Sequence, residues 1–247
     1  MKIISFANQK GGVGKSTLTF NISYLLADKK KKVLMIDFDP QQSLSVICGE
    51  ENHIQYSIYD VLKDSVAIKD AIISITDNLD FIPANQDLAN LDLEIVGLNN
   101  REAILKKALL TVKDLYDYVL IDCPPALNLL LVNALVASTN VIIPTETDYL
   151  SYKGLDLLLN TIAKIKDAVN RDLSLLGVVA TFYDSRTLHS REILELLEEL
   201  DLKVITTVSS STVVKDATLA SLPLHRYSKT NKIVKQYKSI MEAILNG

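Results

Sequence analysis

Cysteine, glycine and proline are all scarce in this chain of 247 residues. The two cysteines, Cys48 and Cys123, lie far apart and form no Cys-x-x-Cys pair, so the sequence indicates neither a disulfide framework nor a zinc site. The eight glycines and six prolines cluster at expected loops instead of marking a boundary between domains. We therefore expect one domain, residues 1–247, in a reducing cytoplasm.

Long apolar runs are also missing. The most apolar stretch, residues 127–137, is interrupted by Asn128 and Asn133 and is too short to cross a bilayer. The formal charge of −4 excludes a protein coated in positive charge, but the charge is unevenly distributed. Residues 203–247 carry seven basic side chains against Asp216 and Glu242. This asymmetry indicates either a basic region that meets an anionic polymer or a solvated helix face.

Short β-branched runs alternate with longer helical patterns, which is typical of a mostly parallel, twisted sheet flanked by helices. Several expected strands are apolar throughout, as is usual when both faces of a parallel sheet are buried. The sequence predicts strands at residues 3–7, 33–37, 79–82, 118–122, 141–144, 175–181 and 203–207. It predicts helices at residues 16–27, 101–114, 154–169, 190–200 and 230–245. The predicted fold class is therefore α/β.

A glycine-rich loop, QKGGVGKST at residues 9–17, lies between the first expected strand and the first expected helix. Its glycines let the backbone wrap closely around phosphate oxygens, and the amides at the helix start donate to an anion. Lys15 is expected to neutralise the β and γ phosphates, and Ser16 to place its hydroxyl on Mg²⁺. The alternative, a plain tight turn with exposed lysines, fits the strand-loop-helix context poorly. The loop predicts a P-loop nucleotide hydrolase.

Two expected strands end in aspartate. Asp37 and Asp39 come at the end of the second strand, and Asp122 ends the strand at residues 118–122. Because the carboxyl ends of adjacent parallel strands converge on the ligand crevice of an α/β sheet, one carboxylate should hold Mg²⁺ through water and another should orient the attacking water. Taken singly, Asp37 or Asp122 could equally be a helix cap or a turn former. The P-loop favours the functional interpretation.

The loop resembles the deviant Walker A motif of the ParA/MinD family of P-loop ATPases, because Lys10 precedes the glycines and Gln9 replaces the first glycine of the general pattern. The same family is matched by DFDPQ at residues 37–41 and IDCPP at residues 121–125. Its ParA branch is matched by IPAN at 82–85, RE at 101–102, KGL at 153–155, LNTI at 159–162 and YDSRT at 183–187. The resemblance runs nearly end to end and is strongest with the short, Soj-like ParA partition ATPases.

This resemblance implies a Mg²⁺-dependent ATP hydrolase with weak intrinsic activity, in which two ATP-bound copies sandwich their nucleotides. The homodimer would bind double-stranded DNA without sequence preference, and a ParB-like centromere-binding protein would stimulate hydrolysis and release the DNA. Lys10 would cross to the partner's phosphates and Asp39 would position the hydrolytic water, so that the catalytic residues would be Lys10, Lys15 and Asp39. The metal residues would be Ser16, Asp37 and Asp122. The nucleotide-binding residues would be Gly11, Gly12, Val13, Gly14, Lys15, Ser16 and Thr17.

Arg186 matches the arginine of the family's Asp-x-Arg-Thr motif, which the resemblance assigns to DNA binding. Where Soj-like relatives carry a Pro-Arg-x-x-Arg stretch, this chain has SSSTV at residues 209–213, so one expected arginine and a proline near the adenine are missing. The last expected helix has an apolar stripe and several lysines away from it. Taken alone it would be a solvated surface helix, but the family context favours DNA. The DNA-binding candidates are Arg186, Lys215, Lys229, Lys232 and Lys235.

Two alternatives stay open. A MinD-like ATPase that cycles on a membrane would use a basic amphipathic helix at the carboxyl terminus, whereas here the final apolar stripe is expected to pack on the core with no spare tail after it. A nucleotide-gated scaffold with little turnover is disfavoured by Asp39 together with Ser16 and Asp122. We therefore predict a cytoplasmic, nucleoid-associated partition ATPase whose cofactors are ATP and Mg²⁺ and which does not bind a membrane.

Overall fold

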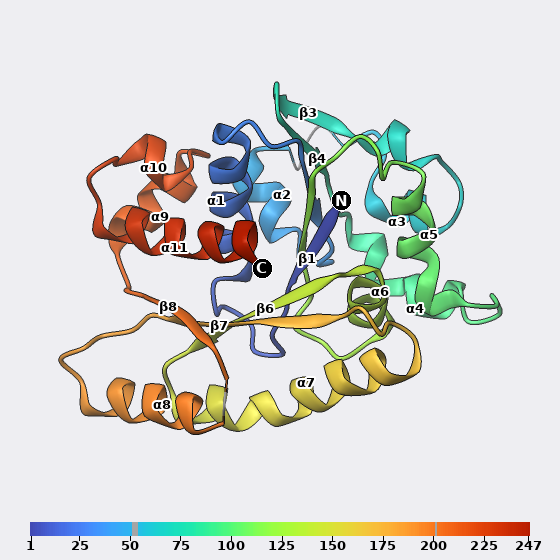
Figure 1. Cartoon of the computed structure of the whole chain (residues 1–247). Coiled ribbons are helices and arrows are strands. Elements are labelled where there is room, and N and C mark those ends of the chain that lie inside the picture. The colour runs from blue at the N-terminus through green and yellow to red at the C-terminus, as the bar shows by residue number, and fades with distance from the viewer. Residues whose placement is uncertain (51–53, 201) are drawn as a thin grey trace.

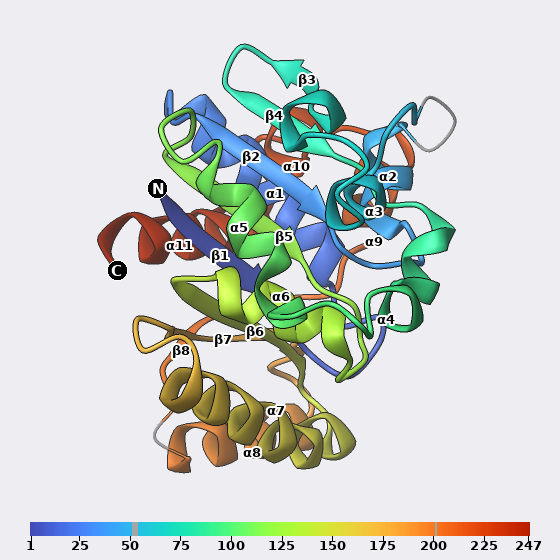
Figure 2. The same ribbon diagram turned by 90° about the vertical axis from the view of Figure 1, so that its right-hand side faces the viewer.

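The computed structural model describes residues 1–50, 54–200 and 202–247. Within them, eight strands form one twisted sheet with helices on both faces (Figure 1, Figure 2). The strand order is β3-β4-β2-β5-β1-β6-β7-β8, and every neighbouring pair is parallel except β3 and β4. The strands are β1 (Lys2–Phe6), β2 (Val33–Asp37), β3 (Ile73–Thr76), β4 (Leu79–Ile82), β5 (Tyr118–Asp122), β6 (Asn140–Glu146), β7 (Ser174–Thr181) and β8 (Val204–Val208). The predicted fold class is confirmed.

Each face of the sheet has its own apolar core and its own layer of helices. One layer contains α1 (Lys15–Asp28), α2 (Ser43–Cys48), α9 (Thr212–Leu219), α10 (Leu224–Tyr227) and α11 (Lys232–Asn246). The other contains α3 (Ile58–Leu62), α4 (Leu91–Glu94), α5 (Ile104–Leu110), α6 (Leu129–Ala137), α7 (Tyr149–Ala168) and α8 (Leu188–Glu199). Successive strand residues point into opposite cores, as Ile3 and Ile4 of β1 do. Both faces are therefore buried, which accounts for the strands that are apolar throughout.

Several elements differ from the sequence prediction. The edge strand β3 was not predicted, because it is only half-buried and pairs antiparallel with β4 alone. The helix predicted at residues 101–114 is a short 3-10 helix, Arg101–Ala103, followed by α5, which ends at Leu110. Further short 3-10 helices lie at Ile68–Ala71 and Gln86–Asn90. α7 begins five residues before its predicted start, because the Asp148 side chain caps its first turn.

The two asparagines that interrupt the apolar stretch at residues 127–137 belong to α6, a helix that the sequence pattern did not predict. Asn128 caps it, since its Oδ1 accepts a hydrogen bond from the Leu131 amide at 3.2 Å. The Asn133 side chain accepts from the Leu105 amide and donates to the Arg101 carbonyl at 2.9 Å, which fastens the start of α5 to α6. Both polar groups are thus satisfied inside the fold. No helix in the described part of the chain is both long and apolar enough to cross a membrane.

The strand order places three functional segments at one edge of the sheet. β5 lies between β1 and β2, and in register Asp122 of β5 pairs with Asp37 on one side and with Phe6 on the other. The glycine-rich loop leaves β1 directly after Phe6. The loop and the two strand-end carboxylates therefore meet at the carboxyl edge, which is where open α/β sheets bind ligands.

Candidate functional site

The glycine-rich loop turns the chain from β1 into the first turn of α1. Gly12 and Gly14 take φ values of 78° and 92°, a region that side-chain-bearing residues adopt only with strain. Gly14 caps α1, and its carbonyl accepts the first helical hydrogen bond from the Leu18 amide at 2.9 Å. The amides of the first turn have no partner within the helix, and the helix dipole adds positive potential there. This loop is therefore built to bind an anion.

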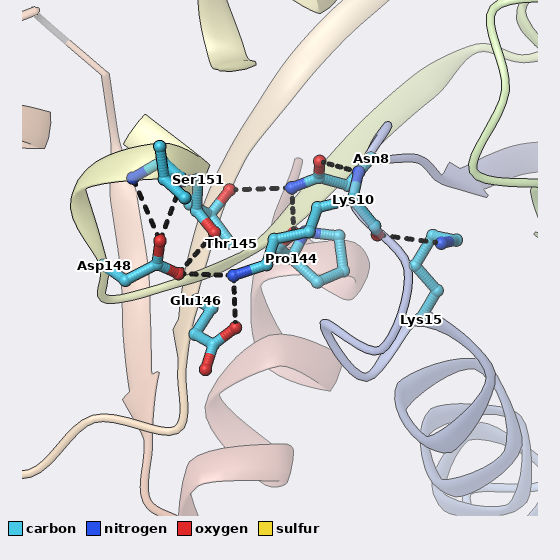
Figure 3. A network of polar contacts seen from close by, with 9 residues as sticks. Asn8, Lys10, Lys15, Pro144, Thr145, Glu146, Asp148 and Ser151 are labelled. Carbon is cyan, nitrogen blue, oxygen red and sulfur yellow. Dashed lines mark hydrogen bonds and ion pairs between the residues drawn. The ribbon is translucent and has the colours of Figure 1, made fainter. Parts of the chain in front are cut away.

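Asn8, which the sequence analysis did not single out, fastens the start of this loop (Figure 3). It is buried, and its Nδ2 donates to the Pro144 carbonyl at 2.6 Å and to Thr145 Oγ1 at 3.2 Å. Its Oδ1 accepts from the Lys10 amide at 3.0 Å. Asn8 thus ties the loop to the carboxyl end of β6, so that the loop is held by β6 as well as by α1.

The two lysines of the loop have different surroundings (Figure 3). Lys15 is buried, 6% exposed, and its Nζ reaches back to the Lys10 carbonyl at 3.5 Å. The Lys10 side chain is 39% exposed and extends to the start of α7, where its Nζ donates to Glu146 Oε2 at 2.7 Å and to Asp148 Oδ2 at 2.6 Å. These hydrogen bonds raise the pKa of Lys10. Lys15 therefore lies within the loop, whereas the charge of Lys10 is held beside it.

The Asp148 carboxylate both caps α7 and accepts a hydrogen bond from Lys10. Its Oδ1 accepts from the amides of Leu150 and Ser151, and its Oδ2 accepts from Ser151 Oγ at 2.6 Å as well as from Lys10. Burial alone would raise the pKa of Asp148, but the hydrogen bonds from Lys10 and Ser151 outweigh it and lower the pKa to about 2. Glu146 and Asp148 were not predicted as site residues. They lie at and just beyond the end of β6, a neighbour of β1, so the strand-end rule that selected Asp37 and Asp122 also applies to them.

Asp37 and Asp122 are fully buried neighbours whose carboxylates are bonded very differently. Asp37 Oδ2 accepts from the amide and the hydroxyl of Ser45, both at 2.8 Å, and its Oδ1 accepts from the Asp39 amide at 3.1 Å. Asp37 therefore holds the first turn of α2. Neither oxygen of Asp122 has a hydrogen-bond partner within the described part of the chain. Burial and then the charge of Asp37 raise the pKa of Asp122, and Ser16 and Lys15 counteract the rise.

The two unpartnered oxygens of Asp122 fit a hydrated cation. A buried acceptor without a partner is costly unless a ligand, ion or water supplies one. Mg²⁺ takes oxygen ligands and usually keeps several waters. Among the residues in the described ranges, no group of three or more His, Cys, Asp and Glu side chains could hold a metal by itself. Ser16 and Asp122 therefore suit a Mg²⁺ ion whose other ligands are phosphate and water.

Asp39 lies just beyond β2 and is also largely buried, 7% exposed. Its Oδ1 accepts from the Gln41 amide at 3.0 Å, and its Oδ2 makes no hydrogen bond to a residue that the structure describes. Burial raises the pKa of Asp39, while the Gln41 hydrogen bond and the positive charge of Lys15 oppose the rise. Asp39 thus keeps one oxygen available close to the charge of Lys15.

A cavity of about 640 Å³ adjoins the loop, within the usual range for a small-molecule site. Its walls include Gly12, Gly14 and Thr17, the residues Thr181 and Phe182 after β7, and the serines at residues 209–211. Thr181 Oγ1 is buried and has no hydrogen-bond partner in the described part of the protein. The serine stretch that departs from the family pattern is therefore one wall of this cavity. Beyond the P-loop and this stretch, the cavity is also lined by Lys215, which the sequence analysis assigned to DNA binding.

The predicted DNA-binding residues lie in three places. The Arg186 side chain is 87% exposed in the loop between β7 and α8 and forms a two-point contact with the Asp184 carboxylate at 2.9 and 2.7 Å. Lys229, Lys232 and Lys235 are exposed at and just before the start of α11. Lys215 is exposed but lines the cavity beside the P-loop, apart from the others.

A family model described as an AAA domain matches residues 1–175. The chain is also 36% identical over 247 residues to the chromosome-partitioning ATPase Soj of Treponema pallidum, covering 99% of this chain and 97% of that protein. The chain belongs to the Soj/ParA family of P-loop ATPases. The resemblance drawn from the sequence motifs is thereby confirmed, and this ParA-type protein is an ATP hydrolase.

Solved structures share the fold of this ParA-type ATPase. A plasmid partition protein from Borrelia burgdorferi B31 bound to AMPPNP is 30% identical, with a TM-score of 0.86 and coverage of 99% of this chain and 98% of that chain. Cobyrinic acid a,c-diamide synthase from Mycobacterium smegmatis, with bound ADP and magnesium, is 31% identical, with a TM-score of 0.87 and coverage of 99% and 94%. The second is named for a different reaction, so this likeness shows the fold and not the activity.

Proposed function

We propose that this ParA-type ATPase is the nucleotide-driven switch of a DNA partition system, cytoplasmic and associated with the nucleoid. Two ATP-bound copies pair across their nucleotides, and the pair binds duplex DNA without sequence preference. Hydrolysis, stimulated by a ParB-like centromere-binding protein, ends the pairing. The names of the Treponema pallidum and Borrelia burgdorferi relatives, a chromosome-partitioning ATPase and a plasmid partition protein, support this proposal.

The observation that carries the proposal is the position of Lys10. Its Nζ lies on Glu146 and Asp148, at 2.7 and 2.6 Å, whereas Lys15 already lies buried within the same loop. Lys10 is therefore a partly exposed positive charge beside a phosphate site that has its own lysine. A second copy brought face to face would offer it phosphate oxygens, and Lys10 would exchange two carboxylates for them.

ATP and Mg²⁺ are the nucleotide and the cation of this site, as ADP with magnesium and AMPPNP in the solved relatives support. When bound, Mg²⁺ would supply positive charge that neutralises the phosphates during phosphoryl transfer. Lys15 neutralises the β and γ phosphates, Thr17 donates to the α phosphate, and Ser16 and Asp122 hold the cation. The cavity beside Thr181 accepts the ribose and the base. The loop residues around the phosphates are Gly11, Gly12, Val13 and Gly14.

Asp37 and Asp39 have separate roles at the end of β2. Both oxygens of Asp37 accept hydrogen bonds, from Ser45 and from the Asp39 amide. We therefore assign Asp37 to linking the cation site with the start of α2, and not to direct contact with the metal. Asp39 keeps one oxygen available and positions the attacking water.

The packing of α11 favours DNA over a membrane as the surface that this protein meets. Its apolar stripe is buried against the sheet and α1, and it consists of Ile233, Tyr237, Ile240, Met241 and Ile244. The helix cannot lay this stripe on a bilayer without leaving the core. Its lysines face outward, where phosphates of a polyanion can reach them.

If the ion pairs with Glu146 and Asp148 keep Lys10 away from the phosphates of a second copy, removing these ion pairs should favour dimerisation. The double variant Glu146→Gln, Asp148→Asn keeps the acceptors that cap α7 but removes both negative charges. Since each partly exposed ion pair contributes roughly 0.2–1 kcal/mol and two such pairs hold Lys10, we expect ATP-dependent dimerisation to tighten by at least about twofold. Sedimentation equilibrium with AMPPNP measures the change.

Asp156→Asn, an exposed position on α7, is the control for the loss of charge on that helix. Its dimerisation should match that of the unmodified protein. Equal or weaker dimerisation of the double variant would show that the two carboxylates do not restrain Lys10.

Arg186→Glu tests the proposed DNA surface. Because the side chain is 87% exposed, ATP binding and dimerisation should be unchanged. The affinity of the ATP-bound protein for unrelated duplexes should fall by about tenfold or more at 0.1 M salt, since one phosphate loses its positive partner and meets a repulsive charge instead. Fluorescence anisotropy of labelled duplexes reports this. Arg171→Glu, the same change in the exposed loop before β7, should bind like the unmodified protein. Normal DNA affinity for Arg186→Glu would move the interface elsewhere.

A further inference from the structure

Four consecutive lysines, Lys29 to Lys32, follow α1 and have no role in the proposed nucleotide cycle. Lys29 ends the helix, Lys30 takes a left-handed φ of 62°, and the amides of both donate back to the last turn of α1. Lys32 faces elsewhere, because its Nζ donates to the Asp77 carbonyl at 2.6 Å and its amide to Asp117 Oδ2 at 2.9 Å. The first three, Lys29, Lys30 and Lys31, are called the α1-end lysines below.

The backbone conformation of this turn does not require lysine at all three positions. Lysine at a helix end offsets the negative end of the helix dipole, and one residue is enough for that. The left-handed position after a helix is usually taken by glycine, which has no side chain to strain, yet Lys30 occupies it. The α1-end lysines therefore place more charge on this surface than helix termination requires, and they do so at a conformational cost.

The acidic residue of the turn is already neutralised. Asp28 accepts from His225 Nε2 at 2.7 Å and from Arg226 Nη2 at 2.6 Å, both from α10, and Arg226 stacks over the Tyr24 ring at 5.0 Å. None of the α1-end lysines forms an ion pair with a residue in the described ranges. Their positive charge therefore stays unopposed at close range.

α11 connects this surface with Arg186. α10 and α11 pack beside α1 (Figure 1). Lys238 is exposed on α11, and its positive charge, after burial and the charge of Arg226, helps to lower the pKa of His225 on α10. At the start of α11, the positive charge of Lys232 helps to lower the pKa of Asp184, although the hydrogen bonds from Arg186 have the larger effect. Lys232, Lys235 and Lys238 are all exposed, with Glu242 as an exposed acid beyond them.

We propose that the α1-end lysines and Lys238 extend the DNA-binding surface, so that the phosphate backbone of one duplex runs from Arg186 along α11 to the end of α1. This inference rests on the proposed function and adds residues to it. Fifteen residues of α11 span about 22 Å, and a duplex presents a phosphate charge about every 1.7 Å of its axis. Along this length the protein meets the phosphate backbone alone, which suits binding without sequence preference.

The test is the triple variant Lys29→Gln, Lys30→Gln, Lys31→Gln, loaded with AMPPNP and titrated with unrelated duplexes from 50 to 300 mM salt. We expect an affinity at least about tenfold lower at 0.1 M salt, and a plot of log K against log salt that is shallower by about 0.9 for each phosphate that is no longer neutralised. AMPPNP affinity and dimerisation should be unchanged. The control, Lys113→Gln, Lys164→Gln, Lys166→Gln, removes the same charge from exposed positions of the α5–α7 layer and should bind DNA normally.

Lys30→Gly is the second variant, because it removes one charge and also relieves the left-handed strain. It should fold at least as well as the unmodified protein and lower the salt slope by about 0.9. Normal DNA affinity and salt slope in both variants would overturn the inference, as would an equal loss of DNA affinity in the control. Either result would leave the proposed partition function standing. If the unmodified protein showed no nucleotide-dependent DNA binding at all, the proposed function would fail first and this inference with it.

Discussion

Lys15→Ala should abolish measurable ATP binding. The Lys15 side chain is buried in the loop, and its positive charge opposes the rise that burial causes in the pKa values of Asp39 and Asp122. Removing it leaves the phosphates of ATP without their main counter-charge in a largely buried site. Breaking such a buried charge pair costs roughly 3–5 kcal/mol, so we expect at least about a hundredfold weaker affinity. Isothermal titration with Mg²⁺ and AMPPNP measures it directly.

Lys10→Ala is the matched control, since it is the same substitution in the same loop. Lys10 lies on Glu146 and Asp148, so a single copy should still bind AMPPNP while pairing of two copies is lost. Unchanged nucleotide affinity in Lys15→Ala would remove the assignment of the phosphate loop. Equal loss of nucleotide affinity in both variants would place Lys10 in the phosphate site of its own copy.

Asp39→Ala is expected to bind ATP, dimerise and bind DNA, yet to lose at least about a hundredfold in turnover. Positioned acid–base groups contribute roughly 10²- to 10⁴-fold to rate. Asp39 keeps one oxygen available for water, whereas the oxygens of Asp122 are assigned to the cation. Steady-state phosphate release with saturating DNA measures the loss. The ATP-bound pair should consequently persist, because its turnover has stopped.

Asp39→Asn separates the chemistry from the structure of the loop. The amide oxygen can still accept the hydrogen bond from the Gln41 amide, so the turn after β2 is kept. Its turnover should be as low as that of Asp39→Ala, because the negative charge is gone from both. A normal rate in either variant would rule out the role of Asp39 in positioning water, and recovery in Asp39→Asn alone would make the role of Asp39 structural.

Much of the fold follows from the sequence because its strands are buried on both faces. An apolar, β-branched run such as VLMID in β2 is distinctive, and β2 was predicted with its full bounds. The edge strand β3 and the short helices carry no such pattern, since they are partly exposed or only a few residues long. α6 was missed for a different reason. Asn128 and Asn133 break its apolar pattern, although Asn128 caps the helix and Asn133 hydrogen-bonds to the Arg101 carbonyl.

The P-loop and the strand-end aspartates could be selected from sequence because each follows a predicted strand directly. The same rule applies to Glu146 and Asp148, but nothing in residues 146–148 indicates that they bind Lys10 until β6 is placed beside β1. The difference between Asp37 and Asp122 was also hidden. Only the fold brings Ser45 to Asp37 and leaves Asp122 without a partner in the described part of the chain. The sequence also could not show that the α1-end lysines lie close to α10, because that follows from the contacts of His225 and Arg226 with Asp28.

The most direct measurement of the partition proposal compares binding to unrelated DNA duplexes and to anionic vesicles, each with ATP, with ADP and without nucleotide. We predict binding to every duplex with ATP only, a steep decrease in affinity with salt, and no binding to vesicles under any condition. Binding to vesicles with ATP, without binding to DNA, would contradict the proposal and favour a membrane-cycling ATPase.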